Sequence, residues 1–310
     1  MPANAKTSQK HRVFVWHLNN WSGVNFALGL TVQNKSTTNT IKITLPKRQK
    51  SATTDPLGAG ICLAKATLGG TLDSFSVYDS QLNTGAGSGV WIVNADSALA
   101  LGQCYCCTYE FTVARASGTG YLDYELRFAC TKTNSVADLR SITSVPVQPQ
   151  GGYSSPIHQR GSWVKAVVNG TLPAFTIAST SSQALCGITA GTGYTDYLYP
   201  KGSSDYDASR DVGNKGHYGA EYNVTIPIQN NSGATRTVRA RITPSTGALY
   251  GGAVKTGGTT YGVPKLVQTG NPNVAHIVDY VAPIGSSSIS FTVMHAGGAA
   301  LPVWFLLTIV

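Results

Sequence analysis

Three of the six cysteines in this 310-residue chain fall within four positions, in the stretch CYCC at 104–107. Thiols this close together can form disulfides, hold a zinc ion, or pack as reduced side chains. Zinc would need a second pair of Cys or His ligands, and no histidine lies near this stretch. Disulfides are the leading interpretation, and the candidates are Cys62, Cys104, Cys106, Cys107, Cys130 and Cys186.

Side-chain alternation along a strand would divide these thiols between two faces. One face would be apolar and would carry Tyr105, Cys107, Tyr109, Phe111 and Val113. Cys104 and Cys106 would then point away from that core, toward Cys62, Cys186 or another chain.

A second apolar strand at 121–130 follows after the short link ASGTG, so we expect an antiparallel hairpin. The register that aligns the two apolar faces makes three pairs: Phe111 with Leu126, Glu110 with Arg127, and Cys107 with Cys130. A cross-strand ion pair and a cysteine pair arise from this one alignment, which supports it.

Oxygen ligands alternate in DYDASRD, at Asp205, Asp207, Ser209 and Asp211. Calcium loops begin with oxygen ligands at alternate positions. However, Arg210 stands where such a loop has glycine, and no glutamate closes the loop at its twelfth position. The stretch is therefore an incomplete calcium site, and the alternative is an Asx-rich surface loop. No other cofactor is indicated.

The chain carries no catalytic signature. Its six histidines are scattered, and it contains no Gly-x-Ser-x-Gly nucleophile elbow, no phosphate-binding loop and no dinucleotide fingerprint after a strand. These absences predict a protein that is not an enzyme.

Short period-two segments between Gly, Asn, Ser and Thr turns predict an all-β protein. The expected strands of the first half are 12–18, 26–34, 40–45, 73–78, 89–93, 106–115 and 121–130. Those of the second half are 162–168, 174–178, 221–230, 236–243, 275–282, 288–295 and 303–310. The one helix signal is a short turn at 135–142. Many short strands joined by turn-rich links favour sandwiches.

A Pro-, Gly- and Ser-rich segment at 144–156 predicts the domain boundary. We expect two β-sandwich-like domains, an N-terminal one at 1–145 with a basic arm and a C-terminal one at 146–310. A long polar segment at 193–219 interrupts the second domain, and its length indicates a functional or self-packed loop.

Charged residues make up only 12% of the chain, and the formal net charge is +9. So few charges are typical of surface, secreted and virion β proteins. The densest basic cluster is formed by Lys42, Lys47, Arg48 and Lys50. It lacks the interleaved aromatic residues of single-strand binding sites, which argues against nucleic acid. An anionic surface glycan or wall polymer is the better candidate for a partner.

The N-terminus shows no recognisable signal peptide, because no apolar run follows its basic residues, and no stretch is long enough to span a membrane. Residues 1–11 are polar and have no apolar pattern of their own, so in an isolated domain they should be mobile unless something holds them. We predict that the arm and the strand behind it contact a neighbouring copy, and the contact candidates are Lys6, Lys10, Phe14 and Trp16. The alternative is that this strand is the first strand of its own sandwich.

Residues 214–244 contain Gly216, Tyr218, Gly219 and Tyr222, followed by a strand, a polar turn and a second strand. This segment resembles part of a family of uncharacterised exported proteins known mainly from cyanobacteria, and residues 69–92 are similar to another part of that family. The resemblance implies an extracytoplasmic β protein and supplies no catalytic residues.

These observations together predict a structural, self-assembling subunit of an extracellular, cell-surface or spore-surface filament, appendage or layer, whose partners are copies of itself. A phage virion protein (tail, fibre or decoration subunit) is the first alternative. A glycan-binding or glycan-cleaving module is the second.

Overall fold

We analysed a computed structural model of the chain. It describes residues 6–20, 22–23, 26–77, 81–82, 89–93, 98–131, 167–178, 183–188, 219–245, 247–269, 273–299 and 303–310. The expected helical turn at 135–142 and nearly all of the loop at 193–219 lie outside this part of the chain. The described residues form strands and one helix, so the prediction of an all-β protein with sandwich-like domains is confirmed.

The chain divides into two compact units. Unit 1 comprises residues 1–55 and 72–146, and unit 2 comprises 56–71 and 147–310. The expected boundary assigned residues 56–71 to the first domain, whereas in the structure this segment belongs with the second. The chain therefore changes unit at three places, after Asp55, after Thr71 and after Pro146.

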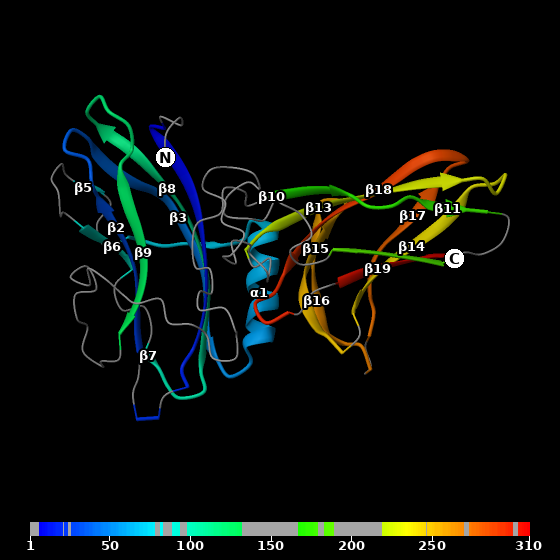
Figure 1. The fold of residues 1–310 in the computed structure, drawn as a ribbon, viewed down its shortest axis with the longest axis horizontal. Coiled ribbons are helices and arrows are strands. Elements are labelled where there is room, and N and C mark those ends of the chain that lie inside the picture. Colours follow the sequence, from blue (N-terminus) through cyan, green and yellow to red (C-terminus); the bar gives the residue numbers. More distant parts are fainter. Residues whose placement is uncertain are drawn as a thin grey trace, which may run out of the picture. The chain divides into compact units, whose positions relative to one another are not determined.

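Unit 1 contains two sheets. Sheet A has β8 between β1 and β3, with all neighbours antiparallel. Its strands are β1 (Ser8–Leu18), β8 (Cys104–Ser117), β3 (Thr40–Thr53), β4 (Asp73–Ser74) and β5 (Gln81–Leu82). Sheet B is built around β2, and its strands are β2 (Phe26–Asn34), β6 (Gly89–Val93), β7 (Ala98–Leu99) and β9 (Tyr124–Thr131). Figure 1 shows these strands in blue to green.

The core of unit 1 takes side chains from both sheets. Leu28, Leu30 and Val32 of β2 are buried with Tyr109 and Phe111 of β8 in one cluster. Alternation along each strand places these residues on the inner faces, as the sequence predicts.

The predicted hairpin between β8 and β9 is wrong. β8 pairs with β1 and β3, whereas β9 pairs with β2 in the other sheet. The chain passes from one sheet to the other through the link between them, and Asn39 binds this link. The Asn39 amide donates to the Tyr121 carbonyl (2.7 Å) and accepts from the Gly120 N–H (2.9 Å). Gly118 has a φ of 93°, where a side chain is strained.

Because β8 and β9 do not pair, the predicted cross-strand pairs between them are wrong as well. Glu110 accepts a hydrogen bond from Arg12 (2.8 Å), and Arg127 instead donates to Glu125. Cys107 lies opposite Val15 and Lys50, and Cys130 lies opposite Leu28 in the other sheet.

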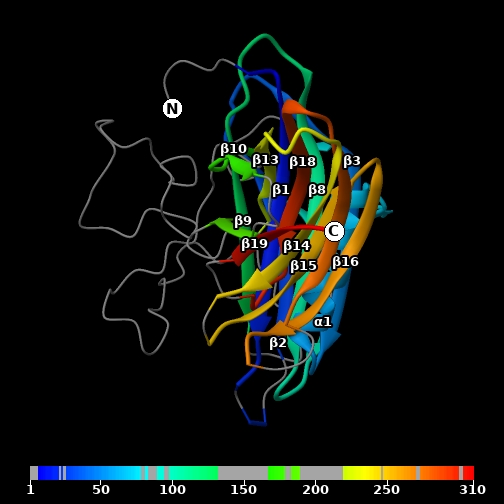
Figure 2. The same ribbon diagram turned by 90° about the vertical axis from the view of Figure 1, so that its right-hand side faces the viewer.

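The described part of unit 2 is a sandwich of a 6-stranded sheet, C, and a 4-stranded sheet, D (Figure 2). Sheet C runs in the order β10 (Val167–Thr171), β13 (Glu221–Asn230), β18 (Gly285–His295), β15 (Leu249–Thr256) and β16 (Thr259–Val267), and β11 (Phe175–Ile177) also pairs with β13. Sheet D runs β12 (Gln183–Ile188), β19 (Val303–Ile309), β14 (Arg236–Pro244) and β17 (Ala275–Ala282).

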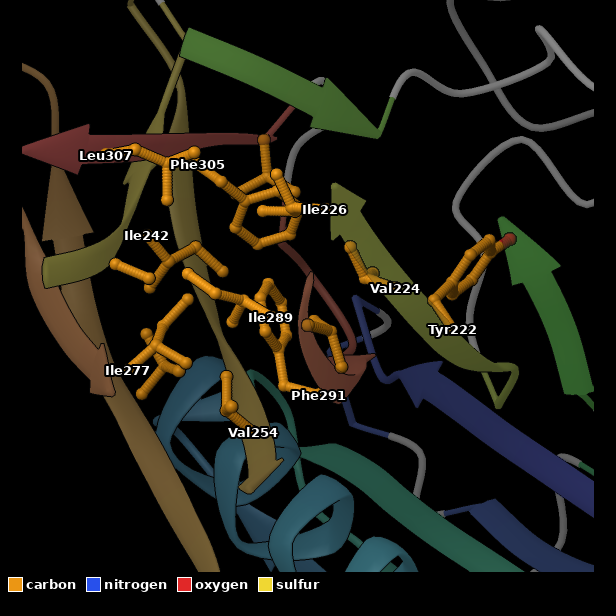
Figure 3. Packing of buried hydrophobic residues seen from close by; sticks show 14 of the residues in the cluster. Tyr222, Val224, Ile226, Ile242, Val254, Ile277, Ile289, Phe291, Phe305 and Leu307 are labelled. Carbon is orange, nitrogen blue, oxygen red and sulfur yellow. The ribbon is translucent and has the colours of Figure 1, made fainter. Parts of the chain in front are cut away.

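The core of unit 2 lies between sheets C and D. Strict alternation in β13 buries every second residue, among them Val224, Ile226 and Ile228. Across the core, the Phe291 ring of β18 meets the Phe305 ring of β19 edge to face, with 5.0 Å between centroids. Figure 3 shows the side chains from both sheets converging there.

The helix α1 (Pro56–Gly69) is the one helix among the described residues, and the sequence prediction missed it. Its end signals are present: Asp55 precedes a proline at the first helical position, and Gly70 follows the last residue with a φ of 70°. The helix packs on sheet C against β15, β16 and β18, and both views show it beside β15 and β16 (Figure 1, Figure 2).

Candidate functional site

The cysteine-rich strand β8 is the central strand of sheet A. Tyr105 and Cys107 belong to the core cluster, and Cys104 and Cys106 lie on the opposite face, as alternation predicts. These two thiols do face away from that core, but they are buried, at 0% and 2% exposure, and do not lie on an exposed outer face. A central strand has a neighbour on both sides: Trp16 of β1 and Ser51 of β3 lie opposite Cys106.

Cys104 and Cys106 form a thiol pair. Their sulfur atoms are 3.7 Å apart, and Cys106 donates to Cys104. This bond, with further bonds from the Trp16 side chain and the His17 backbone, lowers the pKa of Cys104. The same bond and burial raise the pKa of Cys106, so that Cys106 keeps its proton.

No disulfide joins the cysteines whose side chains the structure describes. Cys62, Cys104, Cys106 and Cys107 are reduced, and Cys62 is exposed on α1. The side chains of Cys130 and Cys186 lie outside the described part, so disulfides through them stay a prediction. Within the described ranges, no group of three or more His, Cys, Asp or Glu residues is placed to hold a metal ion.

The calcium candidates Asp205, Asp207, Ser209 and Asp211 lie outside the described residues. The basic cluster lies on β3, where neighbouring residues face opposite sides, so Lys47 and Arg48 do not form one patch. Arg48 instead stacks over the Phe75 ring, 4.7 Å from its centroid.

The contact candidates near the N-terminus lie on or beside β1, which is a strand of its own sandwich. The carbonyl of Lys6 accepts from the Leu122 N–H (3.0 Å), so this end of the arm returns to its own chain. Lys10 is exposed and lies 3.5 Å from Glu110. Phe14 and Trp16 are half-buried on the same face as Lys10. Contacts of these residues with another copy stay a prediction.

The sheet edges of unit 2 differ in how well they resist pairing with a foreign strand. β16 ends sheet C and carries exposed Pro264 and Lys265 at a bulge opposite Tyr250 and Gly252. Proline, lysine and bulges are the features that keep natural sheet edges from pairing. β17 ends sheet D and contains neither proline nor lysine. Its bulge lies near its start and leaves residues 278–282 in regular register.

Among the described strands β17 pairs only with β14, and the hydrogen bonds of β14 show which backbone groups of β17 point away from it. The carbonyl of Thr237 accepts a hydrogen bond from the N–H of Val310, next to the end of β19 (3.0 Å). The backbone groups of Thr237 therefore point toward β19, and those of Val238 point toward β17. Val238 pairs with Tyr280. In an antiparallel ladder, backbone groups alternate in direction. The N–H and C=O groups of Asp279 and Val281 therefore point away from the sheet.

Exposed apolar side chains accompany this edge. Val281 and Ile284, the latter in the turn from β17 to β18, are each 62% exposed. Beside them, Arg239 binds Asp279 through two hydrogen bonds of 2.7 Å, and His276 lies 3.0 Å from the same carboxylate. Arg239, and then His276, hold the pKa of Asp279 well below its usual range. The negative charge of Asp279 is therefore balanced by Arg239 of the neighbouring strand β14.

The sequence does not match any protein-family profile or any curated protein. Among solved structures, a Paenibacillus xanthan lyase is similar at 11% identity and a TM-score of 0.17, over 98% of this chain and 23% of the lyase. The CUB1-EGF-CUB2 domains of human MASP-1/3 are similar at 8% identity and a TM-score of 0.18, over 98% of this chain and 100% of that one. Overlays this poor do not indicate a shared function.

In the described part of the chain, no helix is both long enough and apolar enough to cross a membrane.

Proposed function

We propose that the chain is a non-catalytic structural subunit that associates with copies of itself in an extracellular or surface-bound layer, appendage or filament. The observation that carries the proposal is the edge at β17, where Val281 combines an exposed apolar side chain with outward-pointing backbone groups. The resemblance to exported β proteins and the low share of charged residues agree with a surface setting.

An added strand would gain from this edge in two ways. Each new backbone hydrogen bond contributes about 0.5–1.5 kcal/mol. Burial of a side chain such as Val281 or Ile284 contributes up to about 1.5–3 kcal/mol. Because Arg239 already neutralises Asp279, a second copy does not meet an uncompensated charge there.

The test is the size of the purified full chain in solution. Light scattering and negative-stain microscopy should detect particles larger than the 32.5 kDa monomer, growing with concentration. Val281→Lys should weaken association at least about tenfold, because a charge would be buried and strand pairing lost. Val281→Pro, which removes only an outward N–H, should act in the same direction.

A matched change on the protected edge is the control. Tyr261 of β16 is 53% exposed, and Tyr261→Lys should leave the particle size unchanged. A chain that stays at 32.5 kDa over the full concentration range would refute the proposed function. Equal effects of the two lysine variants would refute the assignment to β17.

A further inference from the structure

The helix α1 has an unusual place in the chain. It lies between β3 and β4 of unit 1, yet it belongs to unit 2. Only residues 54–55 join it to β3, and only residues 70–72 join it to β4. Because these links are so short, unit 1 must accompany the helix wherever the helix docks.

The surface of sheet C on which α1 packs, here called the helix seat, is shaped for close contact. A Cβ placed on Gly60 would lie 2.8 Å from the backbone nitrogen of Gly297, so helix and loop approach as only glycines allow. A Cβ on Gly251 would lie 2.9 Å from the Ile61 side chain. No side chain larger than hydrogen fits at these positions without a shift.

The centre of the seat is apolar. Ala64 and Leu68 of the helix form a buried cluster with Ala253 of β15 and Met294 of β18. Lys255 extends to the carbonyl of Leu68 near the helix end (3.5 Å). Without a helix, this part of sheet C would expose apolar side chains and glycine backbone, so unit 2 requires an occupant there.

The seat does not require that the helix come from the same chain. Between β9 and β10 lie 35 residues (132–166), because β9 ends at Thr131 and β10 begins at Val167. At about 3.3 Å per residue, this length spans at most about 115 Å. A covalent path of this reach permits α1 to dock on its own unit 2 or on that of another copy.

We propose that α1 of one copy docks in the helix seat of the next copy, so that copies are joined head to tail. The contact is heterologous, with helix on one partner and seat on the other, and such contacts build rings or open filaments. The inference rests on the proposed function and adds a second contact to the β17 edge. The contacts within the seat stay the same, so exchange loses none of their stabilisation.

A disulfide can report which chain supplies the helix. A Cβ on Gly69 lies 3.7 Å from the Thr260 Cβ, the separation that disulfides favour. Full-length Gly69→Cys and Thr260→Cys variants, each also carrying Cys62→Ser, are unfolded, mixed and refolded under reducing conditions and then oxidised. Exchange should give a covalent dimer whose linked peptides come one from each variant. Neither variant alone should give it.

Two controls fix the geometry. The chain carrying both Gly69→Cys and Thr260→Cys should crosslink, which shows that the seat is formed. Tyr261→Cys in place of Thr260→Cys should give no mixed dimer, because adjacent strand residues face opposite sides. Failure of both the doubly substituted chain and the mixture to crosslink would overturn the seat itself.

A crosslink within the doubly substituted chain, without any mixed dimer, would overturn the exchange of α1. Light scattering of the same sample then separates the two proposals. Particles larger than 32.5 kDa would leave self-association through β17 standing, whereas monomers would remove both proposals.

Discussion

The thiols of β8 illustrate what single residues reveal before a structure is seen. Alternation assigned Tyr105 and Cys107 to the core and Cys104 and Cys106 to the other face, and both assignments hold. The burial of that second face was not predictable. A strand pattern tells which residues share a side, and it does not tell that Trp16 will lie opposite Cys106.

His11 should make the stability of unit 1 depend on pH. Its ring stacks on Phe111 and hydrogen-bonds to Tyr124. Burial, and then the positive charge of Lys6, lower the pKa of His11 below 6.5. The unfolded chain therefore takes up the proton first as pH falls. The contribution of His11 to the free energy of unfolding should be constant above about pH 7.5 and should decrease below 6.5, by at most about 1.4 kcal/mol per pH unit.

Urea unfolding at pH 7.5 and 5.5, compared between the wild type and His11→Gln, measures this contribution. The variant should lose part of the pH dependence, since glutamine does not titrate. Tyr124 stays protonated at both pH values, because burial raises its pKa to about 12, so it adds nothing to the difference between them. Identical pH dependence in the two proteins would show that His11 is protonated equally in both states.

Connections between elements depend on a few buried polar groups, and Asn39 is the clearest example. Asn39→Ala removes its bonds to Tyr121 and Gly120. These backbone groups are only partly buried, so losing their partner should cost about 1–3 kcal/mol of the stability of unit 1. Urea unfolding gives the loss, and hydrogen exchange at the Gly120 amide locates it. Thr37→Ala, at an exposed neighbour, is the control and should change little.

The sequence analysis missed β15, β16 and α1, although the sequence contains turn or helix-end signals for each of them. β15 and β16 form a hairpin through Gly257 and Gly258, both with positive φ, and a Gly-Gly pair between two strands indicates such a turn. The helix α1 was obscured by glycines at 58, 60 and 69, which lower helix propensity. The helix seat explains Gly60, since the glycine that weakens the helix allows its contact with Gly297.

The β17 edge could be predicted only in part. The segment 275–282 was expected to be a strand, and it is one. Its position at the end of sheet D depends on strand order, which arises from pairings distant in sequence, such as Val238 with Tyr280. No local pattern contains that information.

For the whole molecule, the docking of α1 should determine the stability of unit 2. Gly60→Val would drive side-chain atoms into the backbone of Gly297 and displace the helix. We expect a loss of about 2–4 kcal/mol from unit 2. Hydrogen exchange should show the largest loss of protection in β15, β16 and β18. Cys62→Val, at an exposed position of the same helix, changes helix propensity little and should have a much smaller effect. Equal effects would mean that the contact at Gly60 contributes little.

The place of α1 in the chain also sets an order of events during synthesis. The helix ends at Gly69, and the first strand of its seat begins at Leu249, 180 residues later (249 − 69). At translation rates of about 5–20 residues per second, the ribosome needs about 10–40 s to make that stretch. Throughout this interval the apolar side of the helix has no sheet of its own chain to cover it. In that interval the helix is open to chaperones and to the seats of copies already released from the ribosome, because a seat is complete only once β18 has been made.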